Sequence, residues 1–138
     1  MEHPICQLYK SLYGEKFLYD LLIQDKCEVD YEFPGFMDFY YHLSQIIPYD
    51  HTVLDLGCYI GLQSIYFRNH IAYIGVDSTP MITANLPNTT YYLSDINEFL
   101  KSMPISVDSK IFAICSYVPI DTLRIRQMFS NVFCYYPT

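Results

Sequence analysis

Three aspartates, Asp55, Asp77 and Asp95, lie at or just after the ends of short apolar runs in the middle of the chain. Ionised carboxylates accept hydrogen bonds and pair with cations, so acidic groups in such positions can recognise hydroxyl, amino or positively charged groups. Asp55 is set inside its apolar run, one residue before the turn GCYIG at 57–61. A charge near the end of a buried strand is costly without a partner, so the sequence predicts that Asp55 has one.

These aspartates can share a site only if strands bring them to one edge of a sheet, and the chain after Pro48 alternates between strands and helices. Apolar and β-branched runs predict strands at 52–56, 72–76, 90–93, 111–115 and 132–135. Helices are predicted at 61–69, 96–102 and 121–129, with a short helix or turn at 80–85. Strands that alternate with helices and are apolar on both faces favour a parallel sheet covered on each side. We therefore expect an α/β fold with a doubly wound, mainly parallel, five-stranded Rossmann-like sheet in the order 3-2-1-4-5.

The chain before Pro48 has a different pattern. Helical spacing of apolar residues predicts one helix at 11–24 and a second at 36–47, with a turn at Pro34-Gly35 between them. At 138 residues the chain is of the size of one domain. We expect residues 1–48 to form a helical cap and residues 49–138 to form the α/β core.

Composition excludes several classes of partner. The formal net charge is −7 with eight Lys and Arg residues, which argues against a nucleic-acid partner. No apolar stretch approaches the roughly 18–20 residues of a membrane span, and the N-terminus lacks the pattern of a secretory signal. We therefore expect a cytoplasmic protein. The five scattered cysteines form no CxxC pair, which predicts free thiols and no metal site: Cys6, Cys27, Cys58, Cys115 and Cys134.

In a doubly wound sheet, ligands bind beyond the carboxyl ends of the strands. The segment from Val53 to Val118 resembles class I S-adenosylmethionine-dependent methyltransferases. DLGCYIG is similar to their first motif, an acidic residue followed by spaced glycines. Asp77 matches the acidic residue that ends their second strand, and Asp95 matches the one that follows their third.

The resemblance implies S-adenosylmethionine or S-adenosylhomocysteine as the cofactor. It places Asp55 toward the cationic groups of that molecule, directly or through water, and Asp77 on the ribose hydroxyls. Asp95 would accept from the adenine amino group while Ile96 packs on the ring. The full set of implied cofactor contacts is Asp55, Gly57, Cys58, Tyr59, Gly61, Asp77, Ser78, Asp95, Ile96 and Ser116. A dinucleotide site fits less well, because the GxGxxG pattern is missing.

Each of these assignments has a purely structural alternative. The two glycines can serve a tight strand-to-helix turn, Asp77 can be a turn residue, and Asp95 can be a helix N-cap. Tyr59 is a departure from the resemblance, because the family often has glycine at that position. His42, His51 and His70 are better explained as solvated or core histidines than as catalytic bases.

The catalytic function is less well defined. Ser116-Tyr117-Val118-Pro119 follows the fourth strand, where enzymes that methylate amino groups of nucleic acids carry [DNS]PP[YFW]. Tyr117 is the candidate catalytic residue, with buried packing as an equal alternative. Two functions stay open: methyl transfer to a small-molecule or protein acceptor, or a catalytically inactive binding or inhibitory module of the same fold. The compactness and acidity of the chain would suit a viral or mobile-element origin for the second.

The C-terminal segment NVFCYY at 131–136 is apolar and uncharged. As the last strand of the predicted order it would form an edge of the sheet, and an uncharged edge invites pairing with another strand. The N-terminal segment could cover this edge, but we expect a homodimer that associates through it, because closed two-fold contacts are common.

Overall fold

The computed structural model describes residues 4–16, 33–59, 61–80, 86–103, 110–116 and 122–135. Its helices and strands, in chain order, are α1 (Pro4–Tyr13), α3 (Phe33–Ile46), β1 (Thr52–Leu56), the 3₁₀ helix η1 (Leu62–Phe67), β2 (Ala72–Asp77), β3 (Thr89–Leu93), α4 (Ile96–Ser102), β4 (Ile111–Ser116), α5 (Thr122–Met128) and β5 (Asn131–Tyr135). The predicted helix or turn at 80–85 falls mostly outside the described residues.

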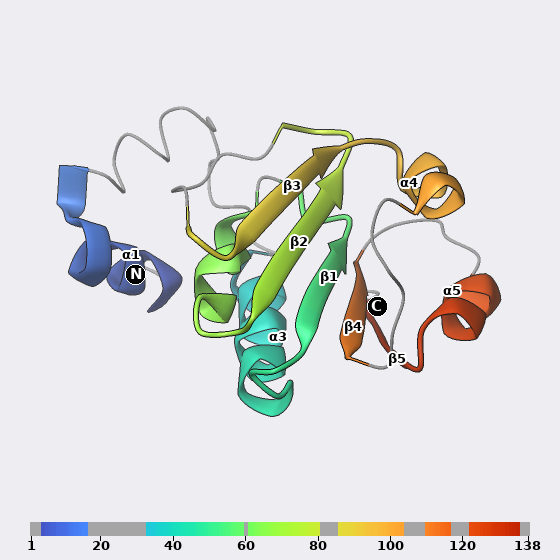
Figure 1. Ribbon diagram of the computed structural model, residues 1–138. Coiled ribbons are helices and arrows are strands. Elements are labelled where there is room, and N and C mark those ends of the chain that lie inside the picture. The colour runs from blue at the N-terminus through green and yellow to red at the C-terminus, as the bar shows by residue number, and fades with distance from the viewer. Residues whose placement is uncertain are drawn as a thin grey trace.

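The five strands form one sheet in the order β3-β2-β1-β4-β5, and every neighbouring pair is parallel (Figure 1). The predicted α/β fold and strand order are thereby confirmed. The chain runs outward from β1 to β3 on one side and from β4 to β5 on the other, so the order reverses between β1 and β4. In such sheets that reversal is the usual place for a ligand.

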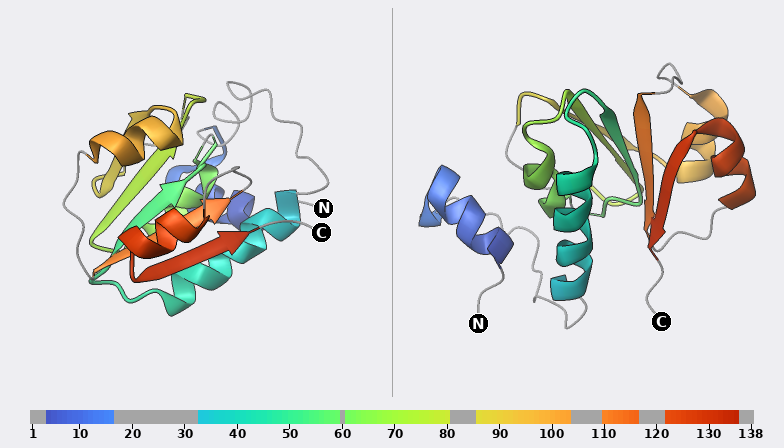
Figure 2. Two further views of the ribbon diagram at one scale, coloured as in Figure 1. Left: turned by 90° about the vertical axis from the view of Figure 1, so that its right-hand side faces the viewer. Right: turned by 90° about the horizontal axis from the view of Figure 1, so that it is seen from below.

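Helices cover both faces of the sheet, as the view from below in Figure 2 shows. Strand β1 alternates, so that Val53 lies in the core on the α3 side and Leu54 and Leu56 lie in the core on the α4 and α5 side. The core on the α3 side consists of Tyr40, Leu43, Ile47, Val53, Phe67, Tyr73 and Ile114. Helix α3, which the sequence places in an N-terminal cap, therefore forms part of one layer of the α/β structure.

Three local predictions need correction. Helix α1 begins at Pro4, where the sequence predicts no helix, and it ends where Gly14 takes a φ of 93°, a conformation that glycine adopts without steric cost. The predicted helix at 11–24 is therefore interrupted at Gly14, and its residues 17–24 lie outside the described part of the chain. Helix α3 begins at Phe33, so Pro34 and Gly35 lie in its first turn and the predicted turn there is wrong. Proline is tolerated in a first turn because its missing N–H has no partner within the helix.

The third correction concerns the segment after the glycine turn. The sequence predicts a helix at 61–69, and the structure has the shorter 3₁₀ helix η1, of which only Tyr66 is not buried. Tyr9 of α1 packs on it and donates a hydrogen bond from its hydroxyl to the carbonyl oxygen of Leu62, at 2.6 Å. Such tight helices occur in short pieces, and here one joins β1 to β2 beneath α1 and α3.

Candidate functional site

The predicted site residues that the structure describes gather at the carboxyl ends of the strands, the edge toward which the arrowheads of β1, β2 and β3 point in Figure 1. The glycine turn follows β1, Asp77 ends β2, Asp95 follows β3 and Ser116 ends β4. Four members of the sequence motifs lie outside the described residues, namely Ile60, the catalytic candidate Tyr117, Val118 and Pro119.

The turn after β1 is built from three residues with positive φ, namely Gly57 at 88°, Tyr59 at 53° and Gly61 at 80°. The backbone N–H groups of Gly57 and Cys58 both donate to the carbonyl oxygen of Val76, at 2.8 and 3.2 Å. These bonds fold the turn over the end of β2. Glycine adopts a left-handed conformation freely, whereas a tyrosine there is strained by roughly 1–2 kcal/mol. The ring of Tyr59 is half exposed, so its side chain is not what holds the strained backbone.

Asp77 holds this turn in place. Its Oδ2 accepts a hydrogen bond from the backbone N–H of Tyr59 at 2.9 Å, and its Oδ1 accepts from the N–H of Thr79 at 2.8 Å. Asp77 thus serves as a turn residue, which was one of the two predicted roles. A carboxylate offers about four acceptor positions, and these two bonds use half of them, so the partly buried group keeps capacity for a ligand.

The predicted partners of Asp55 are side chains of the protein itself. The Asp55 side chain is fully buried on the α3 side of the sheet. Its Oδ1 accepts from the Tyr40 hydroxyl at 2.6 Å, and its Oδ2 accepts from Gln63 Nε2 at 2.9 Å and from the Tyr73 hydroxyl. These donors come from α3, η1 and β2, so one carboxylate joins three elements to β1.

Burial controls the charge state of this cluster. It raises the pKa of the Asp55 carboxyl to about 6, because a carboxylate loses its hydration there, and the bonds from Tyr40, Tyr73 and Gln63 offset only part of that loss. Burial, together with the Asp55 charge, also holds the pKa of both tyrosines well above the usual range. The tyrosine hydroxyls therefore stay protonated and remain donors at any physiological pH.

Two further predicted contacts lie beneath the surface. Ser116 is buried, with its Oγ 3.0 Å from the Tyr40 hydroxyl oxygen, so it extends the Asp55 cluster to β4. Cys58 is fully buried and its thiol donates to the carbonyl oxygen of Tyr59 at 3.5 Å. Burial raises the pKa of the Cys58 thiol, so it stays protonated.

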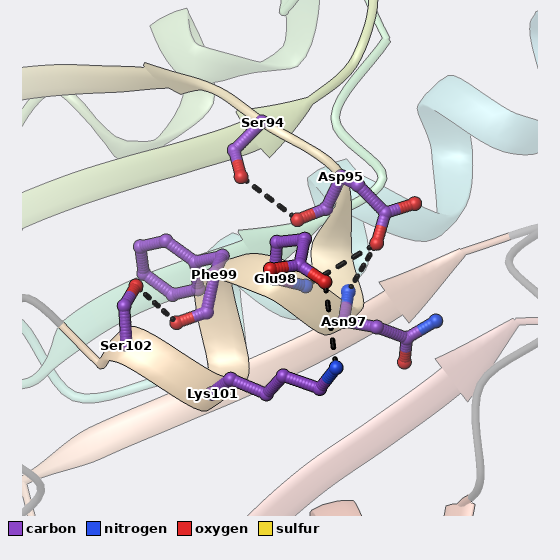
Figure 3. Close-up of polar contacts among 7 residues, drawn as sticks. All are labelled: Ser94, Asp95, Asn97, Glu98, Phe99, Lys101 and Ser102. Atoms are coloured by element: carbon purple, nitrogen blue, oxygen red, sulfur yellow. Dashed lines mark hydrogen bonds and ion pairs between the residues drawn. The ribbon is translucent and has the colours of Figure 1, made fainter.

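Asp95 begins helix α4, as Figure 3 shows. Its Oδ1 accepts hydrogen bonds from the backbone N–H groups of Asn97 and Glu98, at 2.9 and 3.2 Å. The predicted N-cap is therefore confirmed. Ile96, the next residue, is 7% exposed and belongs to the core on the α4 side, whereas Ser78 on the neighbouring loop is exposed.

His70 lies in the core rather than at this edge. Its Nε2 is 2.9 Å from the carbonyl oxygen of Ile47, and the rings of Tyr49 and Phe67 meet it edge to face. Burial lowers the pKa of His70, so the neutral ring donates its Nε2–H to that carbonyl. The histidine is part of the packing, which agrees with the explanation favoured by the sequence.

Three residues that sequence reasoning missed form most of the cluster around Asp55: Tyr40, Gln63 and Tyr73. Gln63 is 1% exposed and lies between the buried Leu62 and Ser64, and a polar pair set between the apolar Leu62 and Ile65 was the signal that could have marked it. Tyr40 and Tyr73 carry no such signal, because both also suit an amphipathic helix and a strand as core residues.

Comparison with known proteins gives no assignment: no family model matches the sequence, and no curated protein is significantly similar to it. Across the described ranges, no group of three or more His, Cys, Asp or Glu side chains could hold a metal ion. In the same part of the chain, no helix has both the length and the apolar character needed to cross a membrane.

Proposed function

We propose that the protein binds S-adenosylmethionine or its demethylated product at the carboxyl ends of β1, β2 and β3, and transfers the methyl group to a small-molecule or protein acceptor. The main support is the contact between Asp77 and the glycine turn. Oδ2 of Asp77 lies 2.9 Å from the Tyr59 nitrogen, so the acidic residue and the turn that resemble the methyltransferase motifs meet at one edge.

The residues at this edge fit the chemistry of that cofactor. Asp77 has acceptor capacity left for the two ribose hydroxyls, and charge-assisted bonds of this kind contribute roughly 1.5–3 kcal/mol each. Gly57 has no side chain to obstruct a ligand above the turn. Asp95 would accept from the adenine amino group with capacity beyond its two capping bonds. The bound cofactor would supply the electrophilic methyl group.

A catalytically inactive module of the same fold is the second candidate, and one observation favours it. The three donors around Asp55 come from its own chain, and the side chain has no exposed surface. A carboxylate so enclosed does not face a cationic ligand at the strand ends. Such a protein could still bind the nucleoside part of S-adenosylmethionine through Asp77. Binding of the cofactor would then not be accompanied by methyl transfer.

Calorimetry with S-adenosylmethionine and S-adenosylhomocysteine tests the proposal. We expect both to bind, and we expect Asp77→Ala to weaken binding by about 10–100-fold through the loss of one or two charge-assisted bonds. Asp50→Ala is a matched control, because it removes one exposed carboxylate just before β1, at the amino ends of the strands and away from the proposed site. Absence of binding by the wild type would remove the site, and binding without methyl transfer to any acceptor would favour the inactive module.

We also propose that two copies associate through β5. Within the described ranges β5 is an outermost strand of the sheet, and it carries no charged residue. Its Phe133 is 41% exposed and stacks on Phe112 of β4. An outermost strand presents backbone donors and acceptors along one side, so a second copy of the same strand is a suitable partner.

Light scattering at tens of micromolar should therefore give the mass of a dimer. We expect Phe133→Lys to shift the protein to the monomer, because a charge and a long flexible side chain oppose strand pairing at an edge. Leu93→Lys is the control, since Leu93 is an exposed apolar residue on β3 at the opposite edge. A monomeric wild type contradicts this proposal, as does an equal effect of both substitutions.

A further inference from the structure

The peptide group between Cys58 and Tyr59 is held from both sides. Its carbonyl oxygen accepts a hydrogen bond from Gln63 Nε2 at 2.9 Å and another from the N–H of Gly61 at 3.0 Å. Its N–H, which belongs to Tyr59, donates to Asp77 Oδ2 at 2.9 Å. In a trans peptide the C=O and N–H groups point in opposite directions, so the same rigid unit contacts the interior on one side and Asp77 on the other.

Gln63 connects this peptide group to the Asp55 cluster. Its Nε2 donates to Asp55 Oδ2 and to the Cys58 carbonyl oxygen, both at 2.9 Å. A side-chain amide has two N–H donors, so each is used once and the orientation of the amide is fixed. Hydrogen bonds therefore run without a break from the buried Asp55 through Gln63 and one peptide group to Asp77.

The backbone of Tyr59 explains why the peptide needs such support. Tyr59 has a φ of 53°, a left-handed conformation that is unfavourable for a tyrosine. Rotation of the Cys58–Tyr59 peptide plane by about half a turn would bring φ of Tyr59 to a negative value and relieve the strain. The same rotation would turn the N–H away from Asp77. The bonds to the carbonyl oxygen and to the N–H oppose this relaxation.

We infer that Gln63 is a positioning residue for Asp77. The hydrogen bond from Gln63 to the Cys58 carbonyl oxygen keeps the Tyr59 N–H directed at Asp77 Oδ2. The bond from Tyr59 in turn fixes the Asp77 carboxylate, whose other acceptor positions are available to a ligand. The consequence for binding rests on the proposed function, because it concerns the ribose hydroxyls of an adenosyl ligand. The orientation of the peptide does not depend on any ligand.

The test replaces Gln63 with methionine, which has a similar length and no N–H donor. In the ligand-free protein, we expect amide hydrogen exchange at Tyr59 to become roughly tenfold faster, in line with the loss of one hydrogen bond. We also expect the affinity for S-adenosylhomocysteine to fall roughly tenfold. Adding Tyr59→Gly should restore most of the affinity, because glycine adopts the left-handed conformation without strain and needs less support.

The outcomes separate this inference from the proposed function. Unchanged exchange at Tyr59 in Gln63→Met overturns the inference, and so does a double variant that binds no better than Gln63→Met alone. If the wild type binds no adenosyl ligand, the proposed function fails and the exchange rate alone decides the role of Gln63. If Gln63→Met does not fold, the wild type decides: slow exchange of both Gln63 side-chain amide protons supports the inference, and fast exchange overturns it.

Discussion

Asp55→Ala is expected to lower the free energy of unfolding by about 3–5 kcal/mol, because it leaves buried hydrogen-bond donors without their acceptor, at a cost of about 1–3 kcal/mol for each. The substitution takes away the acceptor of three donors, Tyr40, Gln63 and Tyr73, in a region with no exposed surface. In this variant the Tyr40 hydroxyl still has Ser116 Oγ as a hydrogen-bond partner, and Gln63 Nε2 still donates to the Cys58 carbonyl oxygen. The loss of hydrogen bonding is therefore greatest at the Tyr73 hydroxyl. Because the free energy of unfolding of native proteins is about 5–15 kcal/mol, this loss is a large share of the total stability. Urea denaturation at pH 7 measures it.

Asp55→Asn has nearly the same shape as the wild type and isolates the charge. The pKa of the Asp55 carboxyl is raised from 3.8 to about 6 by burial, so the folded protein holds this proton more tightly than the unfolded chain does. The resulting stabilisation is fully present below about pH 4 and is lost as the pH rises through about 6. The stability of the wild type relative to Asp55→Asn should therefore fall by roughly 3 kcal/mol over that window. A flat difference between the two proteins would contradict the raised pKa.

The sequence predicts the sheet well because each strand carries its own local signal. The predicted ends of the strands differ from the observed ones by one residue at most, as in β2, which ends at Asp77 rather than at residue 76. Alternation of strands with helices favours a parallel sheet, and the apolar character of the strands on both faces gives the layers. The start of α3 was missed because proline and glycine, which usually mark a turn, also suit the first turn of a helix.

The arrangement around the site was less predictable, for a physical reason. The sequence shows that Asp55 needs a partner, but Tyr40 and Tyr73 are 15 and 18 residues away from it, and only the folded packing brings them together. The resemblance implies a ligand as the partner of Asp55, whereas in the structure the hydrogen-bond donors to Asp55 are side chains of the protein interior. Asp95 was predictable as an N-cap because capping depends on neighbours within one helical turn.

Phe67→Ala tests whether the apolar packing, rather than the hydrogen bonds alone, sets the charge state of Asp55. The Phe67 ring is fully buried, stacks on Tyr73 at 5.5 Å and meets Tyr40 edge to face at 6.3 Å. Its removal breaks none of the hydrogen bonds to Asp55, yet it opens a cavity beside both tyrosines. We expect the free energy of unfolding to fall by about 3–5 kcal/mol. We also expect the pKa of Asp55 to move from about 6 toward 3.8, because water would reach the carboxylate.

Phe129→Ala is the matched control for this substitution, because Phe129 is also buried but belongs to the core on the α4 and α5 side of the sheet. It should cost a similar amount of stability and leave the pKa of Asp55 unchanged. Carbon-13 labelling of the aspartate carboxyl groups, followed through a pH titration by NMR, measures that pKa in each variant. If Phe67→Ala does not fold, Phe67→Leu should give a smaller shift in the same direction. An Asp55 pKa that stays near 6 in the Phe67 variants would mean that desolvation by the sheet and α3 alone is sufficient, and that the ring only fills space.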